Sequence, residues 1–324
     1  SISSYAVADV SVTGGFEWAY TSTSSGVNTS DGDSMATDNT VTIKFTNKTD
    51  NGLSLLAAYD LDADGAGDNA GMDESYLQIG GGFGTLRLGL KDSVNETFGL
   101  GEHDLIDEDL AGAPTGHTIV THSGEQGSND ANKLAYVTPS MGGFQAGYSI
   151  ADSGTATQST DQTAMGASYT MPMAGGSFMV KYNKRSTDGV QDGTQANAES
   201  EATNYGAKLT MGAASVIVSH GESTTGAGAG QRDDIEANGI SVRYSLGGGV
   251  SIGASTVTAE DDKDKTAAGV AEKYTANIAE VSYTVAPGLT AKVTYVDFDY
   301  KRGAETLSVD DSGSITQLTI TASF

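Results

Sequence analysis

Apolar and polar residues alternate along much of this chain, and that period of two constrains its fold more than any other feature. Residues 40–46, 85–91, 240–246, 289–295 and 317–324 each place apolar side chains on one face and polar side chains on the other. A helix needs apolar positions three and four residues apart, and no stretch sustains that spacing. The pattern predicts an all-β chain.

The connections between the alternating segments are short and long in turn. Gly- and Asn-containing short turns, whose residues tolerate positive φ, are expected near residues 49–52, 81–84, 140–143, 172–176, 211–214, 247–249 and 286–288. Long polar connections are expected near residues 21–38, 61–73, 92–130, 151–161, 184–201, 220–234, 259–271 and 300–312. These connections predict sixteen strands, each antiparallel to its neighbours, with all the short turns at one end.

An open sheet of this size would leave two long edges exposed, so we expect it to close into a barrel. The lumen of so wide a barrel cannot be filled by side chains, so the polar face should point inward and the apolar face outward. Outer-membrane barrels have this pattern, with an even strand number, short periplasmic turns and long outer loops. The sequence therefore predicts one domain, residues 1–324, that is a 16-stranded antiparallel up-and-down transmembrane β-barrel. The first residues lack a charged and apolar leader pattern, so we expect a mature chain or one without a signal peptide.

Composition narrows the possible functions. Asp and Glu number 42 and Lys and Arg number 17, a formal charge of −25 that argues against nucleic acid as a partner. The absence of cysteine excludes disulfides, thiolate metal sites and a cysteine nucleophile. No nucleophile elbow, phosphate-binding loop or dinucleotide fingerprint occurs, so we expect no enzymatic activity.

Two segments carry a resemblance to a known family. The last strand, residues 317–324, ends in Phe324, and the longest connection, residues 92–130, follows the fifth strand and contains Asn95-Glu96-Thr97-Phe98-Gly99-Leu100-Gly101-Glu102. The chain resembles the general diffusion porins of Gram-negative outer membranes, particularly the alphaproteobacterial type, although the Pro-Glu-Phe-Gly-Gly form of enteric members is missing. The resemblance implies a homotrimer without a required cofactor. It also implies a third loop folded into the lumen and passive diffusion of small hydrophilic solutes and ions.

Charged residues at two places are candidates for a pore constriction. The acidic candidates in the third loop are Glu96, Glu102, Asp104, Asp107, Glu108 and Asp109, with Glu96, Glu102 and Asp107 favoured. The basic candidates on the polar strand face are Lys44, Arg87, Lys91, Lys133, Lys181, Lys208, Arg243 and Lys292, with Lys44, Arg87 and Lys133 favoured. Opposed rows of these charges would set up a transverse field, and the negative net charge predicts weak cation selectivity. The plainer interpretation is that these cations are simply solvated or extend toward a rim.

One acidic segment matches part of a calcium loop. Asp60, Asp62, Asp64 and Asp68 occupy the spacing of its first nine positions, but the glutamate expected at the twelfth position is absent. Two interpretations of this segment stay open, namely a structural Ca²⁺ site and a solvated acidic loop without a metal ion. In porins this second long loop commonly latches onto a neighbouring subunit, which a bound calcium would stiffen.

Other features bear on membrane partners. Residues 260–264, all acidic except Lys263, suit either divalent-cation bridging to lipopolysaccharide or plain solvation, as do Asp310 and Asp311. Tyrosines near the expected strand ends suit an aromatic girdle: Tyr20, Tyr59, Tyr76, Tyr136, Tyr148, Tyr169, Tyr182, Tyr205, Tyr244, Tyr283 and Tyr295. Two alternatives stay open, namely a channel selective for a sugar or carboxylate, and a secreted calcium-binding β surface protein.

Overall fold

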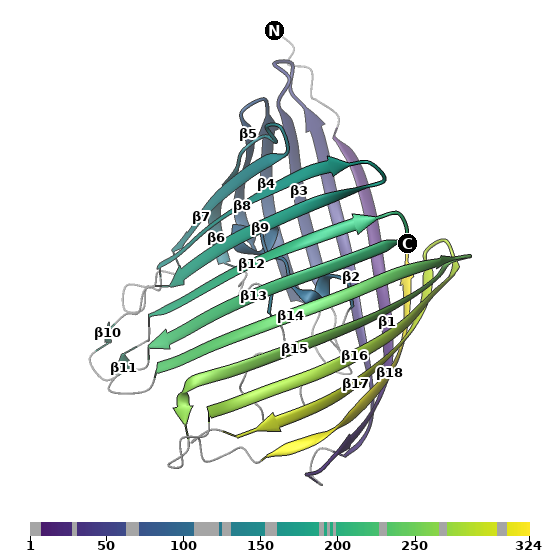
Figure 1. Ribbon diagram of the computed structural model, residues 1–324. Coiled ribbons are helices and arrows are strands. Elements are labelled where there is room, and N and C mark those ends of the chain that lie inside the picture. Colours follow the sequence, from purple (N-terminus) through teal and green to yellow (C-terminus); the bar gives the residue numbers. More distant parts are fainter. Residues whose placement is uncertain are drawn as a thin grey trace.

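The chain folds into one closed antiparallel sheet (Figure 1). The computed structural model describes residues 8–27, 31–62, 71–106, 123–124, 131–152, 161–187, 191–192, 195–196, 199–226, 232–265, 271–302 and 310–324. The barrel strands are β1 (Asp9–Ser25), β2 (Gly32–Lys48), β3 (Ser54–Asp62), β4 (Gly71–Gly81), β5 (Gly84–Lys91), β6 (Ala131–Val137), β7 (Phe144–Asp152), β8 (Asp161–Met173), β9 (Gly176–Thr187), β12 (Ser200–Met211), β13 (Ala214–Gly226), β14 (Arg232–Gly247), β15 (Val250–Lys265), β16 (Ala271–Ala286), β17 (Leu289–Lys301) and β18 (Asp311–Ser323). Strands that follow one another pair, and β1 also pairs with β18, which closes the ring. The predicted barrel of sixteen strands is confirmed.

The remaining described elements are small. β10 (Gln191–Asp192) and β11 (Gln195–Ala196) form a separate two-stranded sheet between β9 and β12. A helix α1 (Val94–Thr97) and a 3-10 helix η1 (Glu102–Asp104) follow β5. No helix among the described residues is long and apolar enough to cross a membrane.

Several strands are longer than the sequence predicts. The expected loop at residues 21–38 is mostly strand, because β1 continues to Ser25 and β2 begins at Gly32. Likewise β15 continues to Lys265, so the mostly acidic residues 260–264 lie in a strand and not in a loop. The alternation of apolar and polar residues stops where a strand extends past the apolar band. The hydrogen-bonded pairing of its backbone with the neighbouring strands continues beyond that point. Strands of 16 or 17 residues therefore extend well beyond the roughly 9–11 residues that a bilayer requires.

The outer face carries the apolar band. Phe45, Tyr148, Tyr182, Val242 and Tyr295 are exposed, and each is paired with outward-facing neighbours on adjacent strands. Tyr76 differs from this expectation, because it pairs with Ala58 on the opposite, inner face. The band confirms which face of the sheet is apolar.

The inner face is not uniformly polar, which corrects the expectation that the inward face of the sheet is the polar one throughout. Side chains of β13 to β18 form a buried cluster that includes Ile217, Val257, Val296, Phe298 and Tyr300. Leu100, Leu105 and Ile106, from the segment after β5, belong to the same cluster. One part of the inner wall therefore serves as a packing surface for a connection within the barrel.

Candidate functional site

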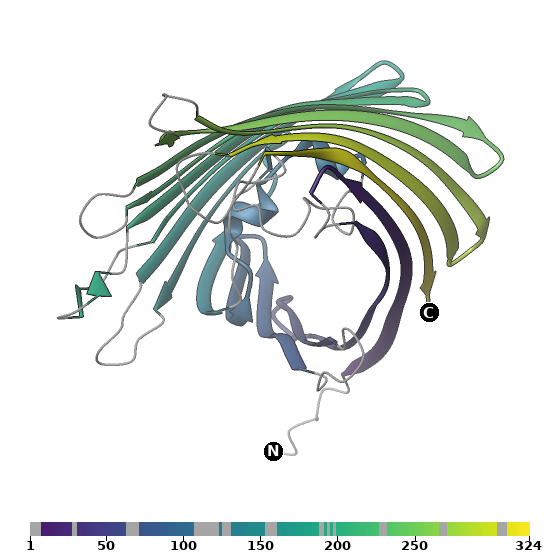
Figure 2. The same cartoon turned by 90° about the horizontal axis from the view of Figure 1, so that it is seen from below.

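The segment between β5 and residue 106 lies inside the ring of strands (Figure 2). Its first residues contact β7 and β8: the backbone N–H of Val94 donates to Ser149 Oγ at 3.1 Å, and Ser93 Oγ donates to Gln162 Oε1 at 2.5 Å. Its last residues, including Leu105 and Ile106, pack with β13 to β18. The segment therefore crosses a large part of the inner wall.

Glycines in the middle of strands make room for this crossing. They face inward on β7, β8 and β12 to β15, with β9 between β8 and β12 contributing none: Gly147, Gly166, Gly206, Gly221, Gly239 and Gly253. A Cβ at Gly166 would lie 2.4 Å from the Cβ of Phe98, and one at Gly253 would lie 2.0 Å from Cδ1 of Ile106. Because real Cβ atoms do not approach so closely, a larger residue at these positions would force Phe98 or the side chain of Ile106 to move. We call these six residues the glycine track.

Buried amides fix the backbone of the segment. Asn204 is fully buried on β12; its Oδ1 accepts from the N–H of Leu100 at 3.0 Å, and its Nδ2 donates to the carbonyl of Leu100 at 3.1 Å. The same Nδ2 also donates to the carbonyl of Ser123 at 2.7 Å. Asn183 Nδ2 donates to the carbonyl of Phe98 at 3.3 Å. These bonds satisfy backbone groups that would otherwise be buried without partners.

Glu102 is an anchor of the segment, which corrects the expectation that it lines a pore. Its side chain is fully buried, and both carboxylate oxygens accept from the N–H of Ser123 at 3.2 Å. The hydroxyl of Ser123 also donates to this carboxylate, and Ser219 Oγ on β13 does so at 3.3 Å. A carboxylate enclosed by these donors has no exposed surface from which to act on a passing solute.

The other acidic candidates fall into two groups. Glu96 and Asp104 are exposed, as expected for groups that face solvent. Asp107, Glu108 and Asp109 lie outside the described residues.

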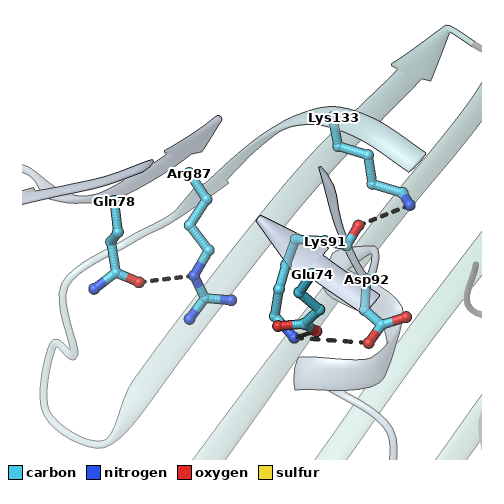
Figure 3. Close-up of polar contacts among 6 residues, drawn as sticks. All are labelled: Glu74, Gln78, Arg87, Lys91, Asp92 and Lys133. Atoms are coloured by element: carbon cyan, nitrogen blue, oxygen red, sulfur yellow. Dashed lines mark hydrogen bonds and ion pairs between the residues drawn. The ribbon is translucent and has the colours of Figure 1, made fainter. Parts of the chain in front are cut away.

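Basic candidates on β5 and β6 are held by neighbours on the inner wall (Figure 3). Arg87 Nε donates to Gln78 Oε1 at 2.9 Å, and Lys91 forms an ion pair with Glu74 and lies 3.6 Å from an oxygen of Asp92. Lys133 Nζ donates to the backbone carbonyl of Lys91 at 2.8 Å. Lys133 is buried, so we correct its expected role as a charge on the open pore wall.

The remaining basic candidates also lie on inward-facing register positions. Lys181 Nζ donates to the carbonyls of Thr97 at 3.1 Å and Gly99 at 2.9 Å, and so holds the segment after β5. Arg243 forms an ion pair with the buried Glu280. Lys44, Lys208 and Lys292 are partly exposed, on β2, β12 and β17. Within the described part of the chain, Lys44 and Lys208 make no ion pair.

The candidate calcium ligands are only half described. Asp60 and Asp62 lie on the inner face of β3, two residues apart, and Asp64 and Asp68 lie outside the described residues. No three His, Asp or Glu residues among those described are arranged to hold a metal ion.

Sequence reasoning missed the glycine track and the two buried amides. A signal for them exists: Gly147, Gly166, Gly206 and Gly239 interrupt segments of alternation instead of ending them, which marks a close approach of another backbone. Only the register, however, shows that these glycines share the inner face on neighbouring strands.

A closed barrel with an apolar outer band and a charged inner wall defines a membrane channel protein of β type. A model of the Gram-negative porin family matches residues 1–303, and the chain belongs to that family. It is accordingly an outer-membrane channel protein of a Gram-negative bacterium. The secreted surface protein considered from the sequence does not fit, because its apolar outer band would face water.

Solved porin structures share the fold. An anion-selective porin from Comamonas acidovorans has a TM-score of 0.71 and 15% identity, over 98% of this chain and 100% of that one. The trimer form of OmpT, an outer-membrane protein of Vibrio cholerae, has a TM-score of 0.68 and 12% identity, over 98% and 100%. A mutant of the Rh. blastica porin has a TM-score of 0.64 and 13% identity, over 98% and 100%. Among curated proteins, none matches this chain.

Proposed function

We propose that this chain, as a single barrel domain of residues 1–324, forms a water-filled channel for passive diffusion of small hydrophilic solutes and ions. The proposal depends on the position of residues 93–106, which lie against the inner wall of the barrel. This segment narrows the lumen, whereas the side chains of the strands do not fill it. The third connection, residues 92–130, then acts as the constriction loop. We place the chain with the general diffusion porins of alphaproteobacterial type on the strength of its sequence resemblance.

Conductance in planar bilayers tests this function. Purified protein added to one chamber should produce stepwise, long-lived increases in current, and liposomes that contain it should swell in small sugars. Absence of both effects with correctly folded, heat-modifiable protein would contradict the proposal. We propose no enzymatic activity, because the sequence carries no catalytic fingerprint and inward charges such as Lys91, Arg243 and Lys181 hold the wall and the segment together.

Weak cation selectivity is part of the proposal. It is supported by the net charge of −25 and by the exposed carboxylates of Glu96 and Asp104 on the segment inside the barrel. A reversal potential measured in a KCl gradient should show K⁺ more permeant than Cl⁻. The opposite sign would contradict this part and leave the channel function standing.

We also propose a homotrimer in contact with lipid and lipopolysaccharide. One similar structure is a trimer form, and the exposed apolar band offers the surface on which neighbouring subunits and lipid would pack. Unheated samples in SDS should migrate at the mass of three chains and collapse to one band on boiling. A single monomer band at all temperatures, with a folded barrel, would contradict the trimer.

A structural Ca²⁺ bound by Asp60, Asp62, Asp64 and Asp68 remains a proposal from their spacing. Two of these carboxylates point to the same side of β3, which brings negative charges together. Removal of calcium with EGTA should lower Tm, and Asp62→Asn should abolish that sensitivity. An unchanged Tm at low free calcium would contradict the proposal.

A further inference from the structure

Charges on the inner wall are sorted along the barrel axis. Inward-facing basic residues lie three to five residues from the strand ends at the short turns: Arg87, Lys292, Lys208, Lys44, Arg243 and Lys181. We call these residues the basic collar. Because they come from six strands distributed around the ring, the collar surrounds the lumen on the side of the short turns.

Inward-facing acidic residues lie farther from the short turns. Six to fourteen residues separate them from the corresponding strand ends: Asp60, Asp62, Asp38, Asp261, Asp311 and Glu272. We call these residues the acidic mouth. Each has the register parity of its inward-facing neighbours; Glu272, for example, lies on the same face as the buried Tyr274 and Ala276.

The exceptions to this sorting are few, and two of them are neutralised by ion pairs. Glu280, at the level of the collar, is buried and paired with Arg243, and Lys91, at the level of the mouth, is paired with Glu74. Glu17 pairs in register with Asp38, so it lies with the acidic residues, and it accepts from Thr321 Oγ1 at 3.0 Å. Asp9 has the same inward register parity and lies at the short-turn end of β1, so it is an acidic exception. Arg185 lies among the acids on β9. Arg243 is neutralised together with Glu280, and the separation persists between the five other basic residues of the collar and the six acidic residues of the mouth.

We propose that the basic collar and the acidic mouth act in series and make ion flow through the channel direction-dependent. This inference rests on the proposed channel function. Near the acidic mouth mobile cations outnumber anions, and near the basic collar mobile anions outnumber cations. One polarity drives cations from the acidic mouth and anions from the basic collar toward the boundary between the two zones, so the concentration of mobile ions in the channel rises. The opposite polarity removes both kinds of ion from that boundary, so the channel carries less current.

The sign of the effect follows from the arrangement. A positive potential on the long-loop side drives cations inward through the acidic mouth and anions inward through the basic collar. Current should therefore be larger at this polarity, by roughly 1.5- to 2-fold at about 100 mV in about 0.1 M KCl, where screening extends over about 10 Å. In about 1 M KCl the screening length falls to about 3 Å, and the ratio should approach one.

The test uses oriented single channels and charge-matched variants. Lys44→Gln combined with Lys208→Gln removes two collar charges that make no ion pair with a described residue, and the current ratio should fall toward one. Lys273→Gln, made on the outward face of β16, removes the same kind of charge outside the lumen and should leave the ratio unchanged. Orientation is identified with Asn51→Cys in the turn between β2 and β3, a unique thiol because the chain has no cysteine. A bulky thiol reagent should alter the current only from the side that carries the short turns.

The outcomes separate this inference from the proposed function. Equal currents at both polarities in dilute salt, or an equal effect of Lys273→Gln and of the collar variant, would overturn the direction-dependence while the channel function stands. A larger current with the long-loop side negative would also overturn it. Folded protein without any conducting steps would instead contradict the channel function itself.

Discussion

Two parts of the inner wall differ in what their inward-facing residues contact. On β3 to β6, charged side chains are held by polar partners on neighbouring strands: Lys91 forms an ion pair with Glu74, and Arg87 donates a hydrogen bond to the amide of Gln78 (Figure 3). On β7 to β15 the wall carries glycines and buried amides, and the segment after β5 lies upon it. The first part presents charge to the lumen, whereas the second part binds a piece of its own chain. The inner wall is thus both a lining and a docking surface.

Substitution of a glycine in the glycine track should have the largest effect on the stability of the barrel. Gly239→Ala places a Cβ 2.0 Å from Oε2 of Glu102, and overpacking of this kind should destabilise the barrel by about 3 kcal/mol. Gly82→Ala is the matched control, because a Cβ there meets nothing within 4 Å, and it should change stability by less than about 0.5 kcal/mol. Urea unfolding in detergent micelles, followed through the fluorescence of the single Trp18, measures both. Equal stabilities would show that the segment is not seated on the track.

Removal of a buried amide should have the next largest effect. Asn204→Ala leaves the N–H and the carbonyl of Leu100 without their partner and should cost about 2 kcal/mol. Asn277→Ala, at an exposed outward position of β16, should leave the free energy of unfolding nearly unchanged in the same urea titration. Noisier single-channel currents should accompany only the first substitution, since it loosens the segment inside the lumen.

Substitutions of Glu102 and Glu96 should affect different properties, the first stability and the second ion selectivity. Glu102→Gln weakens the buried bonds to Ser123 and Ser219 and should cost about 1 to 2 kcal/mol, with little change in reversal potential. Glu96→Gln, at an exposed position, should leave stability unchanged and shift the reversal potential toward anions. If both variants shift selectivity equally, the assignment of Glu102 as an anchor is wrong.

Loss of one charged wall residue should have the smallest effect on stability. Arg87→Ala removes a partly exposed side chain with a single bond to Gln78, and the expected cost is below about 1 kcal/mol. Its effect should appear in conductance in dilute salt. A loss of stability as large as that of Gly239→Ala would mean that the two parts of the wall do not differ as described.

Much of the architecture is predictable because a strand's pattern is local. Alternation in residues 40–46 or 289–295 indicates a strand with one apolar face, and short and long connections in turn indicate the topology. The strand extensions were missed because pairing above the apolar band leaves no alternation to detect. The role of Glu102 was missed because it depends on Ser219, which is 117 residues away and becomes a neighbour only through the register of the barrel.

Engineered cross-linking tests the central claim, the seating of the segment on the inner wall, most directly. A Cβ at Gly206 would lie 3.0 Å from the Cβ and 2.7 Å from the carbonyl oxygen of Leu100, closer than the roughly 3.5–4.5 Å between the Cβ atoms of a disulfide, so the segment must shift slightly to accept the pair. The pair Leu100→Cys with Gly206→Cys should lose stability for this reason, as other substitutions on the track do, and should still oxidise, seen as loss of thiol labelling and a shift on non-reducing gels. The pair Leu100→Cys with Gly253→Cys should stay reduced, because the track at Gly253 faces Ile106. Free thiols in the first pair, or equal oxidation in both pairs, would contradict the account.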